Sequence, residues 1–145
     1  YRVEAAAIER APEATAEKAA ERRQGLRTSA EQGDAKAQWQ LYLYGGRRRQ
    51  DRVWLCRAAD QKNFHALMEV GDLHWAGQDG LQVDRVRAYS WYSVAASLGH
   101  ETARSELMLG RWLLSDSEIE QAQQWAGEWA PGRCAAQLME GEVVD

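Results

Sequence analysis

Apolar side chains recur at steps of three and four residues through most of this chain. In residues 84–98 they stand at Ala88, Trp91, Ala95 and Leu98. This spacing places them on one side of a helix and predicts an amphipathic helix over that range. Gly99 stands where a helix commonly ends in a left-handed residue, so a turn and a second helix from residue 101 are expected to follow.

The same arrangement occurs three times along the chain. Trp91, Ala95, Ala96 and Ala103 correspond to Trp54, Ala58, Ala59 and Ala66, and the last two of these correspond in turn to Ala30 and Ala37. A repeat of about 30 to 40 residues is typical of solenoids built from stacked helical hairpins. The pattern therefore predicts an all-α solenoid of helix-turn-helix repeats.

The predicted helices follow one another with short connections. They span residues 13–32, 34–44, 53–61, 64–76, 84–98 and 101–114, then from Ser115 to about Trp129, with a last short helix over 134–139. Pro12 is expected to interrupt or restart the N-terminal helix, and Ser115 with Glu118 has the spacing of a capping box. Residues 1–28 are interpreted as an N-terminal helical cap, 29–130 as about three repeats with the last degenerate, and 131–145 as a C-terminal cap or tail.

The most complete copy follows the pattern A-x3-L-G-x-L-x3-G and then D-x3-A-x2-W-x3-A-A-x2-G-x3-A. Its residues are Ala66, Val70, Gly71, Leu73, Gly77, Asp84, Ala88, Trp91, Ala95, Ala96, Gly99 and Ala103, with valine in place of the leucine. On these residues the chain resembles the Sel1-like repeat (SLR) family, a relative of the tetratricopeptide repeats, from about Ser29 to Trp129. The other copies depart from the family: Tyr42 replaces the glycine found at Gly71, and SDSEIEQAQQW replaces the usual loop and second helix of the last copy.

The composition agrees with a single helical domain, and the sequence argues against nucleic-acid binding and against a membrane span. The 145 residues are 45% hydrophobic with one Phe and two Pro, and the common alanine, glutamate and arginine favour helices over strands. The net charge of −4 argues against nucleic acid. No run of about 18 apolar residues is present, so no membrane span is expected in this chain. The chain begins at Tyr1 rather than at methionine, which leaves open whether residues precede it and whether they carry a lipid anchor.

No catalytic constellation is found in the sequence. His65, His74 and His100 lack the i, i+4 spacing of metal ligands, and HExxH, CxxC, GxSxG and phosphate-loop motifs are absent. Glu118 and Glu120 are expected on a helix surface rather than as a shielded acid pair. The chain is therefore expected not to be an enzyme and to need no metal or cofactor.

Cys56 and Cys134 are the two cysteines of the chain. An even number is compatible with one disulfide in an oxidising compartment. The bridge requires the chain to fold back after Pro131, so that the two Cα atoms come within about 7 Å of each other. Two buried free thiols are the alternative, and the sequence leaves both open.

Trp75 and Trp112 occupy equivalent positions in the first helices of two repeats, and first helices line the concave surface of such solenoids. Each tryptophan is expected either to pack on the next repeat or to stand exposed as an anchor for a partner. The other candidates on this surface are Glu69, Asp72, Glu106 and Leu109. The basic loop of Arg47, Arg48 and Arg49 is interpreted as a contact for an acidic partner or phosphate or, alternatively, as a solvated turn.

These features predict a non-catalytic module that binds another protein. The SLR resemblance implies the same and, more specifically, a bacterial envelope immunity protein that inhibits a secreted antibacterial effector, for example a phospholipase-type effector of type VI secretion. An adaptor of an envelope or signalling complex is the alternative. Two less favoured alternatives are a ligand-binding or hydrolytic protein and self-assembly through the N-terminal helix. A periplasmic or periplasm-facing anchored location is expected, with the cytoplasm as the alternative, and the oligomeric state stays open.

Overall fold

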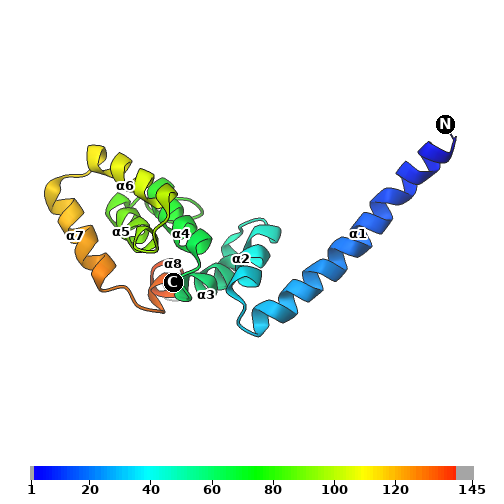
Figure 1. The fold of residues 1–145 in the computed structure, drawn as a ribbon, viewed down its shortest axis with the longest axis horizontal. Helices are drawn as coiled ribbons and strands as arrows, with labels where there is room; N and C mark the ends of the chain where they lie inside the picture. Colours follow the sequence, from blue (N-terminus) through cyan, green and yellow to red (C-terminus); the bar gives the residue numbers. More distant parts are fainter. Residues whose placement is uncertain (1, 140–145) are drawn as a thin grey trace.

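The computed structural model describes the backbone of residues 2–139 and the side chains of residues 15–139. The described backbone consists of helices and short connections, without strands. Its elements are α1 (Arg2–Glu31), α2 (Ala35–Tyr44), the 3-10 turn η1 (Arg49–Asp51), α3 (Arg52–Asp60), α4 (Phe64–Ala76), α5 (Arg85–Ala96), α6 (Glu101–Leu113), α7 (Asp116–Gly127) and α8 (Arg133–Leu138). Figure 1 shows α2 to α8 gathered in one body, from which α1 projects. The all-α architecture predicted from the apolar repeat is confirmed.

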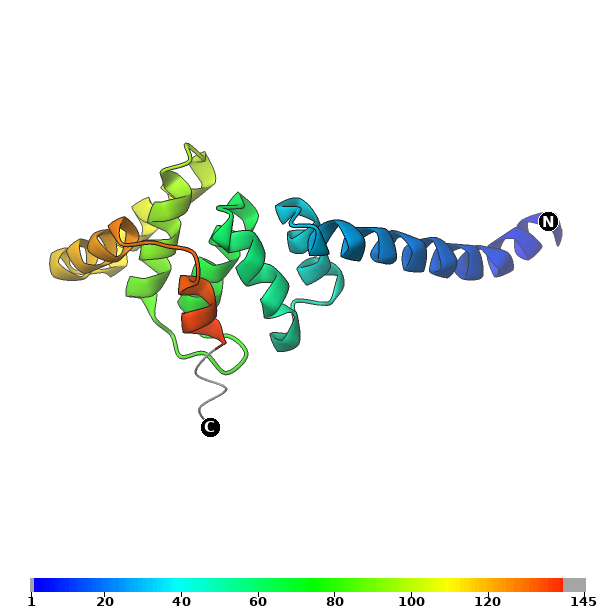
Figure 2. The ribbon, with the colours of Figure 1, turned by 90° about the horizontal axis from the view of Figure 1, so that it is seen from below.

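The helix α1 is continuous and runs through Pro12. The expectation that Pro12 interrupts or restarts the helix is therefore wrong. Proline removes one backbone N–H group, but its φ angle fits a helix, and the surrounding alanine, glutamate and arginine residues favour helix. At the C-terminal end of α1, Leu26 and Ala30 form a small apolar cluster with Ala37 and Leu41 of α2. Ala19, Arg22 and Arg23 of α1 still line a pocket with Tyr44 of α2, and the N-terminal part of α1 extends away from the other helices (Figures 1 and 2).

Local sequence sets the starts of the helices. Asp34, Asn63 and Asp84 each accept a hydrogen bond from backbone N–H groups in the first turn of α2, α4 and α5. The capping box expected at Ser115 and Glu118 is present at the start of α7. These side chains satisfy N–H groups that have no partner within the helix, so the helix boundaries follow directly from neighbouring residues.

The turn between the two helices of adjacent repeats needs a left-handed residue. Gly33, Lys62 and Gly99 occupy it with φ angles of 100°, 58° and 89°. Glycine adopts this conformation without strain, whereas a residue with a Cβ atom loses about 1–2 kcal/mol there. The middle copy therefore keeps the turn geometry of its neighbours although lysine has replaced glycine.

Two glycines let α5 lie close to both of its neighbours. A Cβ atom at Gly71 of α4 would lie 2.5 Å from Cε1 of Tyr92, and one at Gly110 of α6 would lie 2.7 Å from Cδ2 of Tyr89. Both tyrosines belong to α5 and are buried. Because carbon atoms do not pack that closely, alanine at either position would push the helices apart.

The main core surrounds α5. Trp91, expected there from the repeat, is 2% exposed and packs in one cluster with Leu55, Leu67 and Val70. Trp54, its equivalent in the first copy, is half-buried against the same cluster. The repeat register therefore matches the packing of the first two copies.

After α7 the chain turns through Pro131 and Gly132 and returns to the middle of the body (Figures 1 and 2). α7 packs on α5, whereas α8 packs on α3. A disulfide joins Cys56 of α3 to Cys134 of α8, with the Cα atoms 5.2 Å apart. Of the two alternatives that the sequence left open, the structure has the bridge.

A buried arginine strengthens the same junction. Arg52 of α3 is 2% exposed, and its guanidinium donates to the carbonyl oxygens of Gln78 and Asp79 at 3.3 and 3.2 Å. It also donates to the carbonyl oxygen of Leu138, at the end of α8, at 3.5 Å. The sequence pattern assigns this arginine no role, because its acceptors come from distant segments of the chain.

Candidate partner-binding face and a basic cleft

Trp75 and Trp112 are equivalent in sequence but lie in different surroundings. Trp112 on α6 is 87% exposed. Trp75 on α4 is half-buried: its ring centroid lies 6.4 Å from that of Tyr92 and 4.9 Å from the guanidinium carbon of Arg85. α4 lies between α3 and α5, whereas no further repeat within residues 2–139 covers the outer side of α6. Trp75 therefore packs within the body, and Trp112 faces solvent.

The outer side of α6 carries a group of exposed apolar side chains, which we call the α6 face. It consists of Met108, Leu109, Trp112 and Leu113, whose exposed fractions are 68%, 50%, 87% and 53%. Met108 and Trp112 are four positions apart, as are Leu109 and Leu113, and Leu109 and Trp112 are three apart, so these residues adjoin one another on the helix surface. Contiguous exposed apolar surface of this kind is typical of an interaction site.

Two of the predicted surface acids accept hydrogen bonds from buried tyrosines. Glu69 is 7% exposed, and its Oε2 accepts from the Tyr42 hydroxyl at 2.6 Å. Asp72 Oδ1 accepts from the Tyr92 hydroxyl, also at 2.6 Å, and the charge of half-buried Glu106 acts on the same tyrosine. Burial, followed by these carboxylate acceptors, raises the pKa of both tyrosines above its ordinary value. The expectation that Glu69 lies on the binding surface is wrong, because it is buried between α2 and α4.

The basic loop between α2 and α3 folds back on the body. Arg47 forms an ion pair with Glu69 at 3.5 Å, and Arg48 forms one with Asp51 at 3.2 Å. Arg49 also has an interaction partner. The side chains of Arg47 and Arg48 are nevertheless 57% and 59% exposed, so the loop presents positive charge while its position is held.

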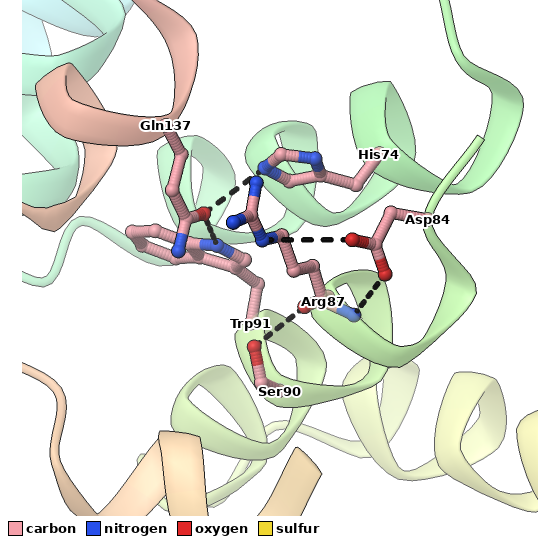
Figure 3. Close-up of polar contacts among 6 residues, drawn as sticks. All are labelled: His74, Asp84, Arg87, Ser90, Trp91 and Gln137. Carbon is pink, nitrogen blue, oxygen red and sulfur yellow. Dashed lines mark hydrogen bonds and ion pairs between the residues drawn. The ribbon is translucent and has the colours of Figure 1, made fainter. Parts of the chain in front are cut away.

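The return of α8 encloses a cleft that the sequence did not predict. The cleft lies between α5, α7 and α8 and has a volume of about 160 Å³. Its lining includes the rings of Trp91, Trp125 and Trp129 and the polar side chains of Arg87, Arg133 and Gln137. Figure 3 shows Gln137 reaching from α8 towards Trp91 and His74.

The orientation of the Gln137 amide follows from its partners. Its Oε1 atom accepts from the indole Nε1 of Trp91 at 2.8 Å and lies 3.1 Å from Nε2 of His74. An indole nitrogen only donates, so the amide oxygen must face it, and His74 must then donate from Nε2. The amide NH2 group of Gln137 consequently points away from both rings and has no acceptor within residues 15–139.

The charged groups at the cleft are cations. Arg87 Nε forms an ion pair with Asp84 Oδ2 at 3.5 Å, while the exposed Arg133 guanidinium has no acceptor within residues 15–139. The hydroxyl of Ser90 is already used, because it donates to the carbonyl oxygen of Arg87 at 2.6 Å (Figure 3). None of the lining residues described is an aspartate or a glutamate. The cleft therefore offers hydrogen-bond donors and positive charge, but no carboxylate base.

The histidines do not form a catalytic cluster with the acids of α4. His65 stacks on Trp39 with ring centroids 5.7 Å apart, and His74 is buried against Gln137, whereas Glu69 bonds to Tyr42. In residues 15–139, whose side chains the structure describes, no three His, Cys, Asp or Glu side chains are placed to hold a metal ion. Among the same residues, no helix has the length and apolar character needed to cross a bilayer.

Stability is expected to fall as the pH is lowered from 6.5 to about 4, because His74 is buried in its neutral form. Burial, and then the charge of Arg87, lower the pKa of His74 from 6.5 to about 4. Between these values the unfolded chain binds a proton that the folded protein excludes. The free energy of unfolding should therefore drop by roughly 3 kcal/mol as the pH falls from 6.5 to about 4. Above pH 6.5 the contribution of neutral His74 to stability is fully retained.

Urea unfolding at several pH values, with His74→Gln as the control, measures this contribution. The amide of the variant can still donate to Gln137 but does not titrate in this range. Carboxylates that titrate in both proteins cancel in the difference between the two curves. An identical pH dependence for the two proteins would contradict the role given to His74.

Comparison with known proteins bears on the fold. No protein-family model matches the chain, and no curated protein is similar to it in sequence. Among solved structures, it is similar to c5321, a protective antigen present in uropathogenic Escherichia coli strains that displays an SLR fold, with a TM-score of 0.64. The chain has an SLR solenoid fold.

This comparison supports a statement about the fold only. Sequence identity to the antigen is 20% over 80% of this chain, and the match covers 25% of the antigen's length. The chain therefore spans about a quarter of that protein. At this level of identity the comparison shows the architecture alone, and it agrees with the helical repeats that the sequence predicts.

Proposed function

We propose that this chain is a non-catalytic module that binds another protein through the α6 face. The proposal rests on the exposure of Trp112, whose side chain is 87% exposed and adjoins three further exposed apolar residues. Tryptophan is the residue type most often found at the energetic centre of protein interfaces, where its ring fills a pocket on the partner. The SLR fold supports the proposal, because solenoids present extended surfaces that are suited to protein partners.

The residues around the α6 face indicate the chemistry of the partner. Arg104 and Arg111 are exposed on the same helix, four residues before Met108 and one residue before Trp112. An apolar centre with a charged rim is the usual anatomy of a transient interface. The partner is therefore expected to offer an apolar pocket with carboxylates beside it.

The compartment and the partner's identity are finer proposals. The Cys56–Cys134 disulfide supports a periplasmic location, because such bridges persist in oxidising compartments. The role as an immunity protein against a secreted effector follows from the family resemblance only and stays a prediction, as does the alternative role as an adaptor. An assay of the partner's own activity with and without this chain separates the two, because an inhibitor abolishes that activity and an adaptor does not.

Replacing Trp112 with alanine is expected to weaken partner binding by about 30-fold or more, which corresponds to roughly 2 kcal/mol lost at an interface centre. The thermal stability should change little, because the ring is in solvent in the free protein. The partner is first captured on the immobilised chain from envelope and cytosolic extracts of its source and identified by mass spectrometry. Its affinity for each variant is then measured by calorimetry.

Val83→Ala is the matched control. Val83 is 58% exposed on the connection between α4 and α5, outside the α6 face, and its replacement should leave the affinity unchanged. If Trp112→Ala binds the captured partner as tightly as the native protein does, the α6 face is not the binding surface.

A further inference from the structure

We propose that the cleft between α5, α7 and α8 is a second binding site, which takes a carboxylate carried on a flat apolar body. The site is formed by Arg87 of α5, Arg133 and Gln137 of α8, and the surrounding indole rings. It is separate from the α6 face. The inference therefore does not rest on the protein-binding function proposed above.

Three polar side chains of the cleft keep hydrogen-bond donors that no acceptor in the described part of the protein uses. The Gln137 amide is held with its oxygen towards Trp91 and His74, so its NH2 group remains available. Arg133 has no acceptor within residues 15–139, and Arg87 uses one edge of its guanidinium for Asp84. The described residues that line the cleft include no Asp or Glu, although Asp84, just outside the lining, partly neutralises Arg87. An incoming anion is therefore attracted chiefly by Arg133, with Arg87 as the second cation.

Planar donors favour a planar anion. A guanidinium group presents its N–H bonds in a rigid fork that matches the two oxygens of a carboxylate, and a primary amide adds donors in the same manner. The cleft volume of about 160 Å³ suits a small ligand or a terminal group better than a folded chain.

The apolar lining specifies the rest of the ligand. Trp91, Trp125 and Trp129 supply ring surfaces on which a flat apolar body can stack. The Nε1 atom of Trp129 is buried and has no hydrogen-bond acceptor in the described part of the chain.

The cleft is held in shape before any ligand arrives. The disulfide at Cys134 fixes α8 to α3 one helical turn before Gln137, and the bonds of Gln137 then fix α8 against α4 and α5. Preorganised donors lose little conformational entropy on binding, so even a small ligand can be retained.

Benzoate is the probe that tests the inference, with benzamide as its neutral counterpart and phenyl phosphate as the alternative anion. Each is titrated into the full chain and followed by the indole N–H resonances of the seven tryptophans. Benzoate should shift the resonances of Trp91, Trp125 and Trp129 while leaving that of Trp112 in place. Benzamide should bind at least tenfold more weakly, because it lacks the charge.

Two variants test which side chains of the cleft contribute to benzoate binding, and a third serves as the control. Arg133→Gln removes an exposed cation and should weaken benzoate binding at least tenfold without affecting folding. Gln137→Glu keeps an oxygen acceptor for Trp91 and His74 but replaces the NH2 donor with a negative charge, so it should abolish binding. Arg22→Gln, an exposed position on α1 that belongs to neither proposed site, removes the same charge elsewhere and should leave benzoate binding unchanged.

Several results would overturn the inference. Equal affinity for benzoate and benzamide would show that charge is not recognised, and tighter binding of phenyl phosphate would reject the carboxylate assignment. Unchanged benzoate binding by Arg133→Gln, or the absence of any shift at the three lining tryptophans, would remove the site. None of these outcomes affects the α6 face, whose test uses Trp112.

Discussion

Replacing Trp91 with alanine is expected to lower the free energy of unfolding by about 3–5 kcal/mol. The side chain is 2% exposed and lies in the main core on α5. Its removal leaves a large cavity and also takes away the donor that orients Gln137. Urea unfolding followed by circular dichroism measures the loss, which should appear as a lower midpoint with an unchanged m-value.

The control for this prediction is a tryptophan of the same size in a different environment. Trp112 is 87% exposed, and Trp112→Ala should change the free energy of unfolding by no more than about 0.5 kcal/mol. A near-neutral effect of Trp91→Ala would contradict the repeat register that places this residue in the core. A large effect of Trp112→Ala would instead mean that the α6 face is packed in solution.

Removing the disulfide through the double variant Cys56→Ala/Cys134→Ala is expected to lower the free energy of unfolding by about 4 kcal/mol. The bridge joins residues 78 positions apart, and closing so long a loop strongly restricts the unfolded chain. Both cysteines are buried, at 3% and 0% exposed, so alanine is the replacement that adds no buried polar group. The double variant also leaves no single thiol to pair with another molecule.

Two measurements check the bridge. Thiol titration of the native, unreduced protein in denaturant should find no free thiol, and two free thiols would contradict the bridge. Urea unfolding of the native protein with and without reductant should reproduce the stability difference of the double variant. If reduction has no effect on stability, the fold-back of α8 is held by Arg52 and Gln137 rather than by the disulfide.

The repeat pattern predicted the helices closely where each is defined by neighbouring residues. The expected span of 64–76 is that of α4, and Asp84 caps α5 at the position from which its helix was expected to start. The capping box of Ser115 is likewise formed between residues three positions apart. Pro12 is the exception, because helix propensity on both sides of a proline can outweigh its missing N–H group.

The binding surface was predicted less accurately than the helices, because the exposure of a side chain depends on which other helix packs beside it. The repeat makes Trp75 and Trp112 equivalent, yet α5 covers the first and no described helix covers the second. Glu69 has the periodicity of a surface residue, but Tyr42, which replaces the usual glycine of the repeat, reaches it from another helix. A substitution in one repeat thus changed the environment of a residue in the next.

Residues a few positions apart, or in equivalent places of the repeat, account for the helices, their ends and their order, since helix formation and capping are short-range effects. Contacts between distant segments account for the rest. The bridge from Cys56 to Cys134, the burial of Arg52 and the place of Gln137 against Trp91 all depend on the direction the chain takes after Pro131. The cleft between α5, α7 and α8 exists only because α8 returns to the body after Pro131. No single stretch of sequence contains that information.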